Sequence, residues 1–129
     1  MESILSSVKK MLGLVDEYEY FDTDIIMHIN SVFSVLRQLG VGPKEGFAIR
    51  DANDLWSDFL PEGLKLEMVK TYMYQKVRLI FDPPASSAAV TAMEKSISEF
   101  EWRINAEVDY GEKKKKNVQY SNRQLSQEI

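Results

Sequence analysis

The sequence predicts a small all-α protein, and three observations lead to that prediction. Apolar residues recur at spacings of three and four along several stretches, which is the period of amphipathic helices. Glycine, proline and polar capping residues separate these stretches. With 129 residues, 44% of them hydrophobic and 28% charged, the chain has the size and composition of one domain with a single core. We expect a bundle of four to five helices over residues 1–106 and an extended, basic C-terminal arm over residues 107–129.

The first predicted element is a short amphipathic helix at residues 3–12. Five apolar side chains fall on one of its faces: Ile4, Leu5, Val8, Met11 and Leu12. Gly13 suits the exit of this helix. A helix of this length is marginal alone in water, so we expect it to dock on the rest of the bundle. Residues 13–21 follow as an acidic, aromatic connector.

The second predicted helix covers residues 23–39. Asp22 is a suitable N-cap, and Gly40 is the expected C-terminal cap. Its core stripe consists of Ile25, Ile29, Val32, Leu36 and Leu39, with Ile26 and Phe33 beside it. The Gly- and Pro-rich residues 40–53 that follow are predicted to be loop, with Phe47-Ala48-Ile49 as a short extended piece that forms half of a small hairpin.

A short helix of one to two turns is expected at residues 54–60, capped by Asn53 or Asp54. Its inward-facing residues are Leu55, Trp56, Phe59 and Leu60. The central helix of the bundle is then predicted at residues 66–81. Its stripe of Leu66, Val69, Met73, Val77 and Ile80 is widened by Tyr72, Tyr74, Leu79 and Phe81. Such a wide apolar face needs neighbours on several sides. Pro83 and Pro84 end the helix at Asp82.

The last predicted helix runs over residues 87–106 and begins at a cap formed by Ser86 or Ser87. Its inner stripe consists of Ala89, Met93, Ile97, Phe100 and Ile104. Trp102 lies about 160° away from Phe100 around the helix, at ~100° per residue, which predicts an exposed aromatic side chain.

The composition changes at Glu107. Residues 107–129 hold five basic and four acidic groups, which leaves a net charge of −5 for the rest of a chain of net charge −4. Few residues are apolar and no helical stripe is present, so we expect this arm to be disordered alone and ordered on a partner. Val118-Gln119-Tyr120 alternates as a strand added to an exposed edge would. The predicted partner-binding residues are Trp102, Lys113, Lys114, Lys115, Lys116, Val118 and Tyr120.

The lysine run Lys113–Lys116 admits three interpretations. It is a solvated segment that keeps the protein soluble, a docking element for an acidic partner or neighbouring subunit, or a contact for nucleic-acid phosphates. Four lysines attract phosphates in a salt-dependent way without reading bases. The acidic balance of the whole chain argues against general nucleic-acid binding.

The sequence offers little chemistry for catalysis. The absence of cysteine excludes disulfides, thiolate metal sites and cysteine nucleophiles. His28 is the only histidine, and one histidine with a nearby carboxylate is too few ligands for zinc. The glycines at residues 40–46 do not match the sequence motif of a phosphate-binding loop. We expect no enzyme activity, no cofactor and no metal. No apolar run approaches 20 residues, so we also expect no membrane-spanning helix.

Four segments carry a resemblance to a known family: DTDIIMHINSVFSVLRQLGVGP (22–43), DLWSDFL (54–60), LEMVKTYMYQKVRLIFDPPASS (66–87) and MEKSISEFEWRINAEVD (93–109). With these phrases the chain resembles the head–tail connector proteins, also called adaptor or head-completion proteins, of tailed phages and prophages of Gram-positive bacteria. The resemblance covers most of residues 15–109 and is weak for the arm.

The resemblance implies a structural role and no catalytic residues. Such proteins form a ring, usually of twelve subunits, beneath the portal in the virion neck, after synthesis in the host cytoplasm. The implied partners are the portal protein, neighbouring copies of the chain, the next neck component (a stopper or tail terminator), and DNA that passes non-specifically through the channel. The alternative function is a nucleic-acid-binding accessory of DNA packaging that uses Lys113–Lys116.

Overall fold

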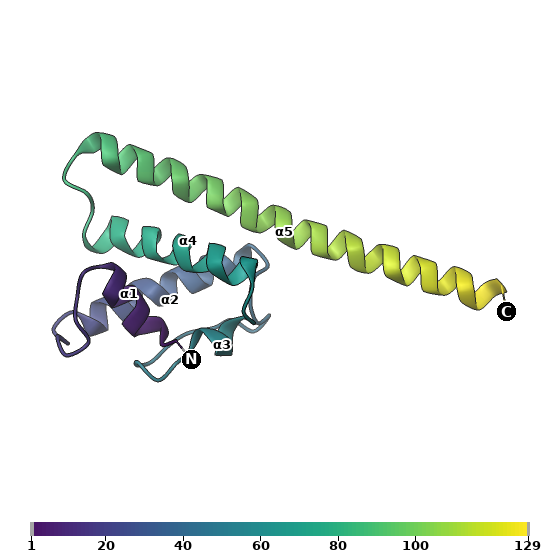
Figure 1. The fold of residues 1–129 in the computed structure, drawn as a ribbon, viewed down its shortest axis with the longest axis horizontal. Coiled ribbons are helices and arrows are strands. Elements are labelled where there is room, and N and C mark those ends of the chain that lie inside the picture. Colours follow the sequence, from purple (N-terminus) through teal and green to yellow (C-terminus); the bar gives the residue numbers. More distant parts are fainter. Residues whose placement is uncertain (1, 129) are drawn as a thin grey trace.

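Helix α4 (Leu64–Phe81) lies at the centre of the fold and contacts three of the other helices: α1 (Ile4–Met11), α2 (Asp22–Gln38) and α5 (Ser87–Glu128) (Figure 1). The remaining helix, α3 (Trp56–Phe59), is a single turn. The computed structural model describes the backbone of residues 2–128 and the side chains of residues 2–108. Within that part the protein is all-α, as predicted, and α4 occupies the central position expected for it.

Helix α1 is fastened at its N-terminal end by residues from α3 and from the loop before it. Ser3 caps the helix by accepting a hydrogen bond from the Ser6 amide at 3.2 Å. The Ile4 amide donates to the Asp54 carbonyl, and the Trp56 amide donates to the Glu2 carbonyl, both at 3.0 Å. The Trp56 indole N–H also donates to the Ser7 hydroxyl at 2.9 Å. These bonds dock a helix that is too short to be stable alone.

Helix α2 begins one residue earlier than the sequence indicates. Asp22 is the first helical residue rather than the N-cap, and Phe21 takes the cap position without a side-chain bond. Two contacts explain the shift: the Phe21 ring packs edge-on against Phe81 at 5.1 Å, and the Asp22 carboxylate pairs with Lys9 at 2.8 Å. The buried residues match the predicted stripe, with Phe33 included and Leu39 partly exposed: Ile25, Ile29, Val32, Phe33 and Leu36.

The loop between α2 and α3 forms no hairpin in the described part of the chain. Asn30 of α2 supplies the bonds that a second strand would have supplied to Ile49. Its Oδ1 accepts from the Ile49 amide at 2.8 Å, and its Nδ2 donates to the Ile49 carbonyl at 3.0 Å. The predicted hairpin at residues 47–49 is therefore wrong, because a side chain replaces the partner strand.

Gly42 shows how closely this loop is packed. Its φ is +88°, and a Cβ at this position would lie 2.3 Å from Cε1 of Phe59. Phe59 is buried and also packs against Phe33, with ring centroids 4.7 Å apart. Only glycine fits here, since any side chain would meet both an unfavourable φ and an aromatic ring.

The buried side of α4 corresponds to the predicted stripe except at its end. Leu66, Val69, Tyr72, Met73 and Val77 are buried. Ile80 was predicted to be part of the stripe but is 56% exposed. In the last turn the contact with the connector is made through Phe81, which meets Phe21, and no described element covers Ile80. The helix ends before Asp82, as the two prolines predict.

Helix α5 begins at a Ser86 cap, whose hydroxyl accepts from the Ala89 amide at 3.1 Å. Ile97 and Ile104 are buried, and Met93, Phe100 and Val108 pack at the edge of the core. Ala89, predicted to face inward, is exposed, because packing against the core begins one turn later at Met93.

The predicted end of this helix near residue 106 is wrong, because α5 continues to Glu128. Residues 107–128 contain no proline and many Glu, Lys and Gln, which are good helix formers. A helix that is already nucleated on the bundle can propagate through such residues without an apolar stripe. The separation of residues 1–106 from an arm that orders on a partner stays a prediction.

Candidate partner-binding surfaces

The distal part of α5 projects away from the bundle (Figure 1). Val108, the last residue of α5 whose side chain is described, packs against the core and lies beside Gly40. The 20 residues from Asp109 to Glu128 would extend roughly 30 Å at 1.5 Å per residue.

Most of the predicted partner-binding residues belong to this projecting part. Lys113, Lys114, Lys115, Lys116, Val118 and Tyr120 all lie in α5, with side chains outside the described residues. The strand expected at Val118-Gln119-Tyr120 is wrong, since this backbone is helical. An apolar–polar alternation over only three residues is a weak strand signal, and it does not stop α5 from continuing through this segment. A role for these residues in partner binding stays a prediction.

Trp102 lies on the part of α5 that packs on the bundle, but it is 72% exposed, as its position on the helix predicts. Ile104, two residues further on, is fully buried on the opposite face. Arg103 and Glu99 form an exposed ion pair at 2.6 Å next to it. An exposed indole on an otherwise polar helix face suits an interface, and its contribution to binding stays a prediction.

Polar bonds hold α5 against α4. The Tyr72 hydroxyl donates to Glu101 at 2.8 Å, and Gln75 exchanges hydrogen bonds with Ser96 at 3.0 and 3.1 Å. Burial raises the pKa of Tyr72 well above its usual range, and the bond to Glu101 raises this pKa further. The phenol is therefore a neutral donor to Glu101 at the contact between α4 and α5.

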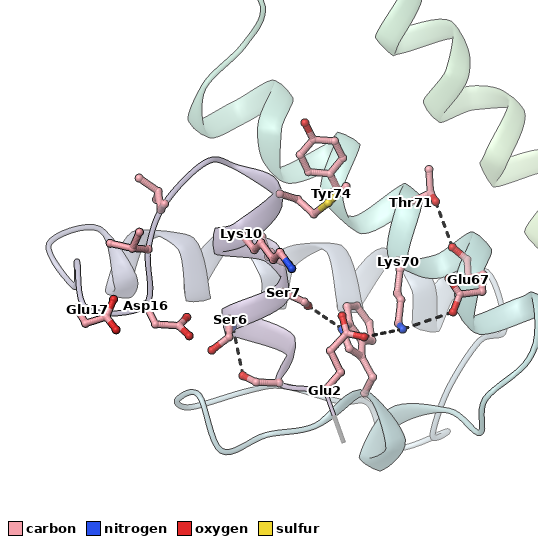
Figure 2. A pocket seen from close by; sticks show the side chains of 16 residues that line it. Glu2, Ser6, Ser7, Lys10, Asp16, Glu17, Glu67, Lys70, Thr71 and Tyr74 are labelled. Atoms are coloured by element: carbon pink, nitrogen blue, oxygen red, sulfur yellow. Dashed lines mark hydrogen bonds and ion pairs between the residues drawn. The ribbon is translucent and has the colours of Figure 1, made fainter.

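A groove lies between α1 and the first half of α4, with a volume of about 880 Å³ (Figure 2). The apolar part of its lining is Val8, Met11, Leu14, Val15, Trp56 and Tyr74. Met11 and Val15 are 57% and 64% exposed. Four carboxylates and two ammonium groups also line it: Glu2, Asp16, Glu17, Glu67, Lys10 and Lys70. No local sequence pattern indicates this groove, because its walls come from segments about sixty residues apart.

The charges of the groove are arranged unevenly. At one end Lys70 bridges two carboxylates, Glu2 at 3.1 Å and Glu67 at 3.5 Å. Burial opposes the charge on Lys70, but these two carboxylates outweigh it and raise the pKa of Lys70. At the other end Asp16 and Glu17 form no ion pair among the described residues (Figure 2). One end of the groove thus holds an ion-paired cluster, and the other end holds two carboxylates that have no ion pair among the described residues.

The acidic end belongs to the connector between α1 and α2, which a buried lysine holds in place. Lys9 is only 2% exposed. Its ammonium pairs with Asp22 at 2.8 Å and donates to the Asp16 carbonyl at 2.9 Å. A buried ammonium with two oxygen partners fixes the path of the chain between them. The side chains of Asp16 and Glu17 are therefore presented on an anchored segment.

The connector also carries exposed aromatic rings. Tyr18 stacks on Tyr20 with centroids 6.4 Å apart, and Tyr20 meets Phe21 edge-on at 4.9 Å. Phe21 continues the contact to Phe81 of α4. Stacking on one another orders the tyrosines while leaving much of their surface exposed.

The structure thus separates the candidate surfaces rather than gathering them in one site. Every residue predicted to bind a partner lies on α5, whereas the groove and the aromatic connector lie on α1, α4 and the segment between α1 and α2. His28 is half-buried on α2. Among the described side chains, no group of three or more His, Cys, Asp or Glu residues could hold a metal ion. Within the described residues, no helix is long and apolar enough to span a membrane.

The fold and these surfaces define a small helical interaction protein with a projecting terminal helix. Residues 4–111 match the family model described as phage connector protein. The chain therefore belongs to the phage connector protein family, as its sequence phrases predict. No curated protein and no solved structure gave a significant match. Membership of this family assigns the protein a structural role in the phage neck, within the virion, in contact with other head and tail components.

Proposed function

We propose that the protein is a non-catalytic subunit of a ring beneath the portal, which extends the DNA channel and carries the next neck component. The observation that carries this proposal is the family match over residues 4–111, joined to a terminal helix that projects past the matched region. In this proposal the bundle is the rigid part of the subunit, and the projecting part of α5 contacts a neighbouring protein. The family resemblance suggests twelve subunits.

Two features of the bundle suit a ring subunit. The first is that its surfaces lie on different sides: α5 and α1 lie on opposite sides of α4 (Figure 1), and the groove lies between α1 and α4. A contact between two different surfaces is head-to-tail, and such contacts close into rings when the rotation between subunits permits. The second is the net charge of −4, which would limit adhesion to DNA moving through the channel.

Electron microscopy of the protein mixed with purified portal would test this proposal. We expect the full-length chain to add a ring to the portal. A shorter chain that ends at Asp109 retains Ile104 and Val108, so its bundle should stay folded by circular dichroism. We expect this shorter chain to lose the ring. Failure of the full-length chain to associate with the portal would contradict the proposal. A ring formed by both chains would support the ring but show that the projecting helix is not needed for it.

The nucleic-acid alternative is favoured by one feature, the placement of Lys113–Lys116 in the projecting helix. It predicts retention of the protein on duplex DNA at low salt, weakening steeply as salt is raised. Replacement of the four lysines by alanine should abolish this retention. Undetectable DNA binding at low salt would remove the alternative and leave the ring proposal unaffected.

A further inference from the structure

We propose that the groove between α1 and α4 binds an apolar, arginine-bearing segment of another protein. This inference adds a binding surface and a partner chemistry to the proposed function, and it does not depend on the formation of a ring. Helices α1 and α5 lie on opposite sides of α4, so the packing of α5 leaves the groove open (Figure 1).

The groove has an apolar wall that is open to solvent. Its volume is about 880 Å³, which is large enough to enclose several side chains. Met11 and Val15 on this wall are 57% and 64% exposed, and Leu14 and Tyr74, which also line it, are partly buried. Removing such apolar surface from water on binding is favourable. Because these residues line one concavity, they suit a protruding apolar segment of a partner.

The unpaired charges of the groove define the charge of the segment that it would accept. Its lining holds four carboxylates and two ammonium groups. Asp16 and Glu17 form no ion pair among the described residues, whereas Lys70 bridges the carboxylates at the other end. A cationic group would be attracted to Asp16 and Glu17, and nucleic-acid phosphates or an acidic peptide would be repelled. The charges therefore favour a basic protein segment over nucleic acid.

Lys10 supplies a second contact of a different kind. Its ammonium group forms no ion pair among the described residues. In the view of Figure 2 it lies between the acidic end and the cluster around Lys70. A bound segment would thus place its cationic side chain at Asp16 and Glu17 and a carbonyl or carboxylate oxygen at Lys10.

The tyrosines of the connector favour arginine over lysine as the cation. Tyr18 and Tyr20 follow Glu17 along the connector and are 46% and 79% exposed, with ring centroids 6.4 Å apart. Glu19 lies between them in the sequence and forms no ion pair among the described residues. A planar guanidinium group can stack on an aromatic ring while it binds a carboxylate, and an ammonium group lacks this geometry.

The acidic end is already held in place in the absence of a partner. Lys9 is only 2% exposed, and its ammonium donates to the Asp16 carbonyl at 2.9 Å and pairs with Asp22 at 2.8 Å. The Leu14 amide donates to the Lys9 carbonyl at 2.8 Å. Because these bonds fix the backbone that carries Asp16, binding would order few further groups and lose little conformational entropy.

Nuclear magnetic resonance of the full-length chain with synthetic peptides would test this surface. The probes are peptides of equal length with the same leucines, which differ in having arginines, lysines or glutamates beside them. We expect the arginine peptide to shift the methyl signals of Met11 and Val15. The lysine peptide should bind about threefold more weakly, and the glutamate peptide should cause no shift. Met27 is the internal control, because it is 59% exposed on α2 and lies outside the groove.

Substitutions would identify the groups that bind the peptide. Asp16→Asn with Glu17→Gln should weaken binding of the arginine peptide by up to about tenfold, because two exposed charge interactions are lost. This variant keeps the Asp16 carbonyl that Lys9 holds. Glu45→Gln with Glu94→Gln removes the same charge at exposed positions outside the groove and should have little effect. Circular dichroism of each variant checks that the bundle is folded.

Several outcomes would overturn the proposal. These are equal shifts with the arginine and glutamate peptides, equal shifts at Met27, or no shift at saturating peptide concentrations. Shifts of Met11 and Val15 that grow with protein concentration alone would assign the groove to a second copy of the chain, and shifts on addition of duplex DNA would assign it to nucleic acid. Because no portal is present in this experiment, its failure leaves the ring proposal standing, and failure of the chain to form a ring on the portal leaves the peptide result standing.

Discussion

Helices α4 and α5 are the two longest in the protein, and they are stabilised differently. All 18 residues of α4 lie within the bundle, and buried residues recur from Leu66 to Val77. Helix α5 has 42 residues, but its described buried residues are only Ile97 and Ile104. The first helix is held by burial, and the distal part of the second is favoured by the helix propensity of its residues. The comparison shows that an apolar stripe reports where a helix is covered and does not determine how long the helix is.

The largest expected effect comes from placing a charge in the covered helix. Val77 is fully buried in α4, so Val77→Asp would bury an unpaired carboxylate and should cost more than about 4 kcal/mol, enough to unfold a domain of this size. Loss of the helical circular-dichroism signal would show it. Ile80→Asp on the same helix is the control, because Ile80 is exposed and the variant should remain folded. A folded Val77→Asp protein would mean that this face of α4 is not core.

Replacing a glycine by alanine is expected to have opposite effects in the bundle and in the projecting part of α5. Gly42→Ala should destabilise the bundle by roughly 2–4 kcal/mol, because the new Cβ meets Phe59 at a positive φ. Gly111→Ala, in the projecting part of α5, should instead favour the helix locally by about 1 kcal/mol.

Urea unfolding and helical signal would measure these two effects separately. We expect Gly42→Ala to lower the unfolding midpoint and Gly111→Ala to leave it unchanged while raising the helical signal. If Gly111→Ala shifted the midpoint as strongly as Gly42→Ala does, the distal helix would be coupled to the core, and the distinction between the two regions would fail.

A smaller effect is expected where the two helices are joined. Tyr72→Phe removes the bond to Glu101 and should cost about 1 kcal/mol at neutral pH. Because the pKa of Tyr72 is raised in the folded state, its contribution is complete below pH 10, the ordinary tyrosine value, and is lost as pH rises above it. Urea midpoints measured at neutral and alkaline pH should therefore fall less in Tyr72→Phe than in the natural protein. An identical alkaline decrease in both would exclude this tyrosine as the cause.

The smallest effect on stability is expected at Trp102. Its side chain is largely exposed, so Trp102→Phe should change the free energy of unfolding by less than about 0.5 kcal/mol. Fluorescence quenching checks the environment directly. The variant keeps only the buried Trp56, and its emission should be poorly quenched by iodide compared with the natural protein. A large loss of stability would place Trp102 in the core instead.

Much of the bundle could be predicted because its helices have local signals. The apolar stripes of α2 and α4, the serine cap of α5 and the double proline after α4 each act within a few residues. The predictions that were wrong concern features decided by distant residues. Asp22 is not the cap because its carboxylate pairs with Lys9 while the preceding Phe21 packs against Phe81. The backbone of Ile49 bonds to the Asn30 side chain rather than to a strand.

By itself the sequence determined the all-α class, the positions of the main helices, the exposure of Trp102 and membership of the connector family. Periodicity, caps and characteristic phrases are properties of neighbouring residues, so they can be read directly. Only the tertiary structure decided the groove between α1 and α4, the buried Lys9 and the direction in which α5 leaves the bundle. These depend on which segments meet across the core, and a local pattern of side chains does not contain that information.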